Sequence, residues 1–172
     1  VAMRFEIESW RWAGVPWLIR TGKCLGATAT EAVIRFNQPP RLLFADAESR
    51  HAAPNELRFR MGADDGVTLH MVAKAPGDRM VTHPIDLDVS YEKALGDRDE
   101  AYQRLLEDAM VGDQRRIGRV DSLEEQWRIV EPVLADPPET VLYKEGSMGP
   151  HEADALAADV GGWLDPLVPG QD

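Results

Sequence analysis

The hydrophobic periodicity of this sequence changes partway along the chain, and that change constrains the fold more than any other feature. Up to about Tyr91, apolar residues alternate with polar ones, as in strands that bury one face. Beyond it, apolar residues recur every three or four positions, as on one side of a helix. Strands followed by helices predict an α+β fold, with a large, mostly antiparallel sheet and several helices, mainly in the second half of the chain.

Six stretches show the alternation that is typical of strands: residues 3–7, 17–20, 30–36, 57–61, 67–72 and 85–91. The clearest pair is a hairpin, in which a short loop with Gly62 and Gly66 at its ends joins two alternating runs. We expect these strands to form one antiparallel sheet.

Three helices are expected, over residues 102–110, from residue 121 onward, and from residue 150 to residue 160. Asp97 and Glu100 have the spacing of a capping box before the first helix, and Gly112 is placed to close it. Pro132 should end or kink the second. The tail after Trp163 is expected to fray.

Composition and charge exclude several classes of function. The chain has 172 residues, with 19 Lys and Arg against 30 Asp and Glu, so its net charge is −11. An acidic chain repels phosphate backbones and anionic lipid, and we expect neither a nucleic-acid nor a membrane partner. A single cysteine, Cys24, forms no internal disulfide, which favours a reducing compartment such as the cytoplasm. Because the sequence begins at Val1, inside a strand pattern, we interpret it as one domain, residues 1–172, of a longer chain.

The sequence contains little that indicates catalysis. Its one glycine-rich turn, from Gly62 to Gly66, lies between two expected strands, whereas a dinucleotide-binding turn leads from a strand into a helix. We find no nucleophile elbow and no zinc-ligand spacing, and therefore assign no catalytic residue, cofactor-binding residue or metal ligand. His70 and His83 are interpreted as packed or surface residues, because no carboxylate is visibly paired with them.

Basic residues offer two candidate binding sites. Arg58 and Arg60 share one strand face and could form an anion site, but an edge or solvent-facing surface balanced by Asp86 and Asp88 explains them better. Lys23 lies in a loop between Gly22 and Gly26, where glycine permits positive φ and a tight turn. Its ammonium could approach an anionic or polyhydroxylated ligand, although a lysine in such a loop is usually a solvated surface charge.

At this point several blocks of the sequence match a known family in order. They are residues 10–16 with 19–25, 55–57, 74–77, 100–106, 127–129 with Pro132 and Leu134, and 146–150. Together they resemble the carboxy-terminal domain of bacterial-type glucose-6-phosphate dehydrogenases, over essentially the whole chain. The resemblance implies a domain that contributes substrate contacts and a dimer or higher homo-oligomer interface to an NADP-dependent oxidoreductase of the pentose phosphate pathway.

For Lys23 the resemblance implies a specific role. It matches the family lysine in the Thr-Gly-Lys block, which projects into the substrate site and helps hold the phosphate of glucose 6-phosphate. Many members carry basic residues five and six positions later, where they help bind that phosphate or, in some animal enzymes, a structural NADP⁺. Thr28 and Ala29 stand there instead, so we expect no structural NADP⁺ site, and Arg60 is interpreted as structural.

The family's amino-terminal half, with its dinucleotide-binding turn and its catalytic histidine, has no counterpart in this sequence. Oxidation of glucose 6-phosphate to 6-phosphogluconolactone needs a positioned base and a bound cofactor, so we expect this chain alone to be inactive. In the complete enzyme, NADP would be bound mainly by the half that is absent here. The alternative hypothesis is a non-catalytic binding or assembly protein that shares this domain.

Overall fold

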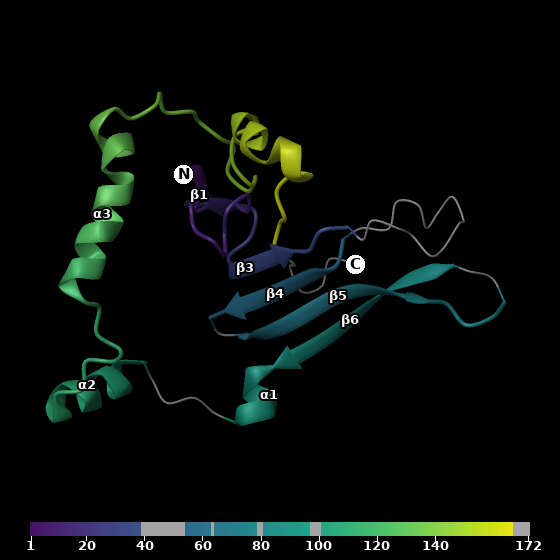
Figure 1. The fold of residues 1–172 in the computed structure, drawn as a ribbon, viewed down its shortest axis with the longest axis horizontal. Coiled ribbons are helices and arrows are strands. Elements are labelled where there is room, and N and C mark those ends of the chain that lie inside the picture. Colours follow the sequence, from purple (N-terminus) through teal and green to yellow (C-terminus); the bar gives the residue numbers. More distant parts are fainter. Residues whose placement is uncertain (39–53, 63, 79–80, 97–100, 167–172) are drawn as a thin grey trace. The chain divides into compact units, whose positions relative to one another are not determined.

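The computed structural model describes residues 1–38, 54–62, 64–78, 81–96 and 101–166 (Figure 1). They fall into two compact units, Val1–Gly96 with Tyr143–Asp172, and Asp97–Leu142. The first unit contains every described strand and the second contains the two longer helices. The mixture of strands and helices confirms the α+β prediction.

In the described part of the first unit, six strands form two antiparallel sheets. They are β1 (Ala2–Glu6), β2 (Pro16–Arg20), β3 (Thr30–Arg35), β4 (Glu56–Met61), β5 (Gly66–Lys74) and β6 (Thr82–Ser90). The first two pair with each other, and the other four pair in chain order. The expectation of one sheet is therefore wrong. The connection between β2 and β3 is hydrogen-bonded to a distant segment through Gly26, whose amide donates to the Ser147 carbonyl, rather than closing a hairpin.

The expected hairpin is present as β4 and β5. Arg60 lies opposite Gly66 and Phe59 opposite Val67, so the two alternating runs pair in the register that their sequences indicate. Gly62 leaves β4 with a φ of +131°, a conformation that favours glycine over residues with a side chain.

One face of the four-stranded sheet carries charged and polar side chains, and it is buried at Arg58 and Thr68, whereas the Asp88 side chain on β6 stays about half exposed. The register aligns Arg58, Thr68 and Asp88 across β4, β5 and β6. Arg58 is 3% exposed and Thr68 is 4% exposed. The interpretation of the arginine face as an edge or solvent-facing surface is therefore wrong at Arg58, because the burial of a strand residue depends on what covers the sheet and not on alternation alone.

The opposite face carries the apolar side chains of the same strands. Ile34, Leu57, Leu69 and Leu87 form one continuous row across β3 to β6. The outer members of the row remain about half exposed, Ile34 at 47% and Leu87 at 55%. A contiguous apolar surface of this kind is typical of a region that another protein surface covers.

The end of the chain forms a segment that covers the charged face, and we call residues 151–166 the carboxy-terminal strap. Its first part is the 3₁₀ helix η2 (His151–Val160), which begins after Pro150 as expected and ends at Gly161, whose φ is +87°. The indole of Trp163 donates a hydrogen bond to the Ala153 carbonyl at 2.9 Å, which folds the second part of the strap back onto the first.

Arginines from four strands hold the strap in place. Arg4 donates to Leu156 and Asp159, Arg20 to Asp165, Arg35 to the Val160 carbonyl, and Arg58 to the Asp165 carbonyl. Arg20 also stacks over the Trp163 ring, 4.9 Å from its centroid. The strap thus joins the two sheets, and the expectation of fraying directly after Trp163 is wrong for Asp165.

In the second unit, α2 (Ala101–Val111) ends at Gly112 as the sequence predicts. Gly112 has a φ of +72°, and the amide of Asp113 reaches back to the Asp108 carbonyl at 2.8 Å. The carboxylate of Asp108 is buried and accepts from Arg116 at 2.7 Å. The expected capping box lies outside the described residues.

Pro132 does not end the helix α3 (Val120–Ala135), which continues for three residues beyond it. Of the two expected outcomes, an end or a kink, the structure thus excludes the end, because a proline in the last turn removes one backbone donor without blocking the residues after it. The short helix α1 (Tyr91–Leu95) was not expected, since Tyr91 was assigned to the preceding strand. Ser90 starts it by accepting a hydrogen bond from the Lys93 amide.

Asp88 on the charged face gives a prediction about acid stability. The Thr68 hydroxyl, at 2.5 Å, and the Arg60 guanidinium, at 2.7 Å, both donate to its carboxylate and hold the pKa of Asp88 below its ordinary value of 3.8. A lowered pKa in the folded state contributes stability that is complete above 3.8 and is lost as the pH falls through the lower folded value. We expect Asp88→Asn to destabilise the protein at neutral pH and to flatten this acid decline, as measured by urea unfolding across pH. Parallel curves for the variant and the parent would contradict it.

Candidate functional site

The loop from Thr21 to Gly26 carries Lys23, the one site residue that the sequence singles out. It follows β2 directly, and the amide of Thr21 donates to the Val1 carbonyl at 2.9 Å, so the first loop residue extends the pairing of β1 with β2. Lys23 itself is exposed. Among the described residues, no carboxylate pairs with its ammonium, which leaves the charge available to an anionic ligand.

A distant segment, residues 143–148, clamps this loop with three hydrogen bonds. The Tyr143 hydroxyl donates to the Lys23 carbonyl at 2.5 Å. The Gly146 amide donates to the Cys24 carbonyl at 2.9 Å, and the Gly26 amide donates to the Ser147 carbonyl at 3.0 Å. Because these bonds hold the backbone at residues 23, 24 and 26, the loop around Lys23 has a defined conformation although its side chains lie in solvent.

The two loop glycines are required for close approach rather than for positive φ. Neither has a φ in the left-handed region, and the one positive φ in the loop belongs to Cys24, at 53°. A Cβ at Gly22 would lie 2.9 Å from the Tyr143 hydroxyl, and a Cβ at Gly26 would lie 2.8 Å from the Gly146 carbonyl oxygen. The prediction that these glycines supply a positive φ is therefore wrong. They instead leave room for residues 143–148 to approach the loop closely.

This close approach predicts that Gly26→Ala is destabilising. The added methyl would meet a backbone oxygen, which moves only if the clamping segment moves, and overpacking of this kind costs about 1–3 kcal/mol. Denaturant unfolding measures the effect. Gly118→Ala is the matched control, because its Cβ would meet nothing within 4 Å. Equal unfolding midpoints for the two variants would show that the approach at Gly26 is not tight.

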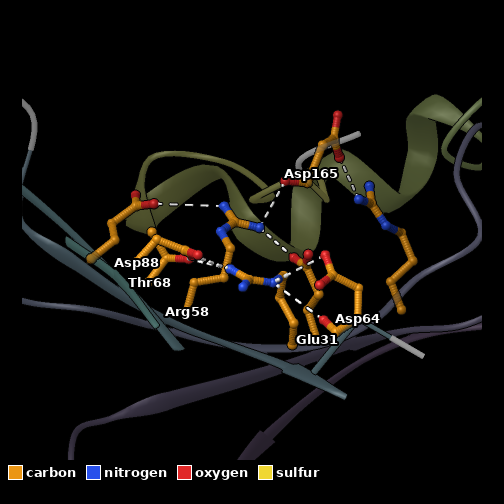
Figure 2. Close-up of polar contacts among 9 residues, drawn as sticks. Glu31, Arg58, Asp64, Thr68, Asp88 and Asp165 are labelled. Atoms are coloured by element: carbon orange, nitrogen blue, oxygen red, sulfur yellow. Dashed lines mark hydrogen bonds and ion pairs between the residues drawn. The ribbon is translucent and has the colours of Figure 1, made fainter. Parts of the chain in front are cut away.

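The second candidate, the arginine pair on β4, is neutralised within the protein (Figure 2). Arg58 donates from Nη1 to Glu31 at 2.5 Å and to the Asp165 carbonyl at 3.1 Å. Arg60 donates to Asp88 at 2.7 Å and to Thr68. Both guanidinium groups thus have acidic partners, as the sequence indicated for Arg60 and Asp88. Their arrangement favours a structural role over anion binding.

His70 has a partner that the sequence analysis missed. Its Nδ1 atom lies 2.6 Å from Asp86 Oδ1, because the register of β5 and β6 places the two residues opposite each other. The expectation that no carboxylate pairs with this histidine is wrong. Its other ring nitrogen, Nε2, is buried and has no hydrogen-bond partner among the described residues. The pair of His70 and Asp86 is thus a contact between two neighbouring strands of the sheet.

Other kinds of site are not indicated by the part of the chain that the structure describes. That part contains no group of three or more His, Cys, Asp or Glu side chains able to hold a metal ion. None of its helices is long and apolar enough to cross a membrane. Cys24 is a free, exposed thiol. The loop of Lys23 thus remains the candidate site.

Sequence reasoning missed the residues that hold this loop. Tyr143 and Lys23 are separated by 120 residues, and no local pattern connects them. A signal is nevertheless present in residues 146–150, a block that contains Gly146 and Gly149. Glycines that occur in two distant loops can indicate two backbones that meet.

Comparison with known families gives a consistent result. A family model described as "Glucose-6-phosphate dehydrogenase, C-terminal domain" matches residues 1–164. Glucose-6-phosphate 1-dehydrogenase 1 of Mycobacterium tuberculosis is 40% identical over 169 residues, covering 98% of this chain and 35% of that relative. Glucose-6-phosphate 1-dehydrogenase of Aggregatibacter actinomycetemcomitans is 39% identical over 165 residues, covering 94% of this chain and 33% of that relative.

Solved structures agree with these relatives. The crystal structure of glucose-6-phosphate 1-dehydrogenase from Mycobacterium avium matches with a TM-score of 0.80 at 36% identity, over 98% of this chain and 35% of that chain. A glucose-6-phosphate dehydrogenase in complex with its substrate glucose-6-phosphate matches with a TM-score of 0.81 at 30% identity, over 96% of this chain and 34% of that chain. This chain spans about a third of the length of the curated relatives it matches.

Proposed function

The chain belongs to the glucose-6-phosphate dehydrogenase family, whose carboxy-terminal domain it matches, and from this premise we propose that it forms part of the substrate site of such an enzyme. The proposed reaction oxidises glucose 6-phosphate at C1 to 6-phosphogluconolactone and transfers a hydride to NADP⁺. Residues 1–172 act in it as a single domain. The observation that carries this proposal is the exposed ammonium of Lys23, which has no acidic partner in the described part of the chain, on a loop whose backbone is fixed.

In this proposal Lys23 binds the phosphate of the substrate. A charge-assisted hydrogen bond from an ammonium to a phosphate is about twice as strong as a neutral one. The chain as a whole carries a net charge of −11, so an exposed ammonium with no acidic partner among the described residues offers a sugar phosphate a local attraction. Thr28 and Ala29, which follow on the same connection, add no charge.

The residues that the structure describes do not form a dinucleotide-binding turn for the cofactor. The dinucleotide-binding turn of a coenzyme domain presents backbone amides where a strand leads into a helix, whereas the turn after Gly62 joins two antiparallel strands. Arg58 and Arg60, which could otherwise meet a cofactor phosphate, are paired with Glu31 and Asp88. We therefore propose that NADP is held by another part of the enzyme, and we assign no step of hydride transfer to this chain.

Activity measurements test the proposal directly. We expect the full-length protein that carries this sequence to produce NADPH from glucose 6-phosphate and NADP⁺. The 172-residue chain is expected to produce none, because it supplies no base for C1 and no cofactor site. NADPH production by the isolated chain would overturn this division of roles. A full-length protein that binds glucose 6-phosphate without oxidising it would instead support a non-catalytic binding protein.

We also propose that the apolar face of the four-stranded sheet is covered by a second copy of the chain. The two ends of its central row, Ile34 and Leu87, are about half exposed, and isologous pairing of such faces is the usual route to a dimer. Sedimentation at increasing concentration is expected to show self-association, which Leu87→Asp weakens. A monomer throughout the concentration range would contradict it.

The free thiol of Cys24 fits a reducing compartment, and we propose the cytoplasm.

A further inference from the structure

We propose that Tyr143 is the positioning residue of the substrate site, acting through the backbone of Lys23. The inference rests on the proposed function, in which the ammonium of Lys23 contacts the substrate. Tyr143 lies in the clamping segment, 120 residues further along the chain, and its hydroxyl donates to the carbonyl oxygen of Lys23 itself at 2.5 Å.

This hydrogen bond fixes the peptide unit that follows Lys23, and the backbone there sets the direction of the Lys23 side chain. The carbonyl of Lys23 belongs to the peptide unit that connects it to Cys24, and the next carbonyl, of Cys24, accepts from Gly146 at 2.9 Å. Two successive peptide units are therefore fixed by one segment. Because Cys24 has a left-handed φ of 53°, which a residue with a side chain rarely adopts, the loop needs such contacts to hold its conformation.

A fixed backbone matters more for Lys23 than for a buried residue. Its side chain is exposed and has no acidic partner among the described residues, so nothing except the backbone restricts it before a ligand arrives. Ordering a loop during binding costs affinity, and a loop that is already ordered avoids that cost. Tyr143 thus contributes to substrate binding as a positioning residue that acts through another residue.

Gly22 supports the same assignment independently. A Cβ at this position would lie 2.9 Å from the Tyr143 hydroxyl and would displace it. The glycine before Lys23 is therefore matched to the tyrosine. We expect Gly22→Ala to reproduce the effect of removing the hydroxyl, and the double variant Gly22→Ala with Tyr143→Phe to resemble either single variant.

The test uses steady-state kinetics of the full-length protein with glucose 6-phosphate. Tyr143→Phe removes one hydroxyl, and the loss of one hydrogen bond corresponds to a change of about three- to tenfold. We expect this change in KM, with kcat altered much less and the melting temperature close to that of the parent. Tyr91→Phe is the matched control, because it removes a hydroxyl from the same unit, away from the loop, and is expected to leave KM unchanged.

Double variants show whether Tyr143 acts through Lys23. With Lys23→Ala in place, Tyr143→Phe is expected to cause no further change, because the group that it positions is gone. A full three- to tenfold effect that persists with Lys23→Ala would overturn the proposal. A loss of kcat at unchanged KM would also overturn it, since that result would assign Tyr143 to the chemical step.

Amide hydrogen exchange separates this proposal from the proposed function. The amides of Gly26 and Gly146 are the other two donors of the clamp, and we expect both to exchange faster in Tyr143→Phe but not in Tyr91→Phe. If exchange rises and KM does not, while Lys23→Ala raises KM, only the positioning role fails. If Lys23→Ala leaves KM unchanged, the proposed function fails, whatever the exchange shows.

Discussion

Replacing Arg58 with alanine is expected to lower the free energy of unfolding by about 3–5 kcal/mol, the usual cost of removing one partner from a buried ion pair. The Arg58 side chain is 4% exposed and that of its partner Glu31 is 8% exposed, so the carboxylate would remain buried without its hydrogen-bonded guanidinium. The same change removes the hydrogen bond to the Asp165 carbonyl and loosens the carboxy-terminal strap. Urea unfolding followed by circular dichroism measures the loss.

Two further variants keep this result interpretable. Arg128→Ala removes an arginine whose pair with Glu125 is largely in solvent, and it is expected to leave the unfolding midpoint unchanged. Combining Arg58→Met with Glu31→Leu removes both charges and is expected to recover much of the lost stability. If Arg58→Ala unfolds at the same urea concentration as Arg128→Ala, the buried pair does not stabilise the fold.

Replacing Lys23 with alanine is expected to lower kcat/KM for glucose 6-phosphate in the full-length protein by about 10- to 100-fold, the range that corresponds to one charge-assisted hydrogen bond. The melting temperature should change little, because the side chain is exposed and the clamp holds the loop through backbone carbonyls that alanine retains. Initial-rate kinetics and a thermal scan on the same preparation measure both quantities.

Lys93→Ala provides the matched control, since it removes an exposed ammonium from α1 of the same unit and should leave kcat/KM unchanged. Lys23→Arg keeps the charge on a different, planar head group, and we expect it to be intermediate between the parent and Lys23→Ala. Equal kinetics in Lys23→Ala and the parent would remove Lys23 from the substrate site.

Strand positions could be predicted from the sequence because alternation is a local property. The hairpin of β4 and β5, for example, follows from two alternating runs and a loop with glycine at each end. Alternation also shows that Arg58 and Arg60 share a face. It does not show which face is buried, because that depends on the strap, which begins more than ninety residues after Arg58.

The site was predicted only in part, for a related reason. Lys23 was found from its glycine-flanked loop and from a resemblance, but the residues that give the loop its conformation come from residues 143–148. The pairing of His70 with Asp86 was missed although both strands were predicted, because it depends on the register and not on the strands themselves. Contacts between distant segments need the fold before they can be named.

The strap also has a consequence for synthesis on the ribosome. Arg58 leaves the exit tunnel 107 residues before Asp165, a delay of roughly 5–20 s at ordinary translation rates. Once β6 has emerged as well, the sheet has its strands but still lacks the Asp165 carbonyl that Arg58 binds. Stable folding of the nascent chain is therefore expected only after Asp165 emerges, and ribosomes stalled upstream of it should hold a protease-sensitive product.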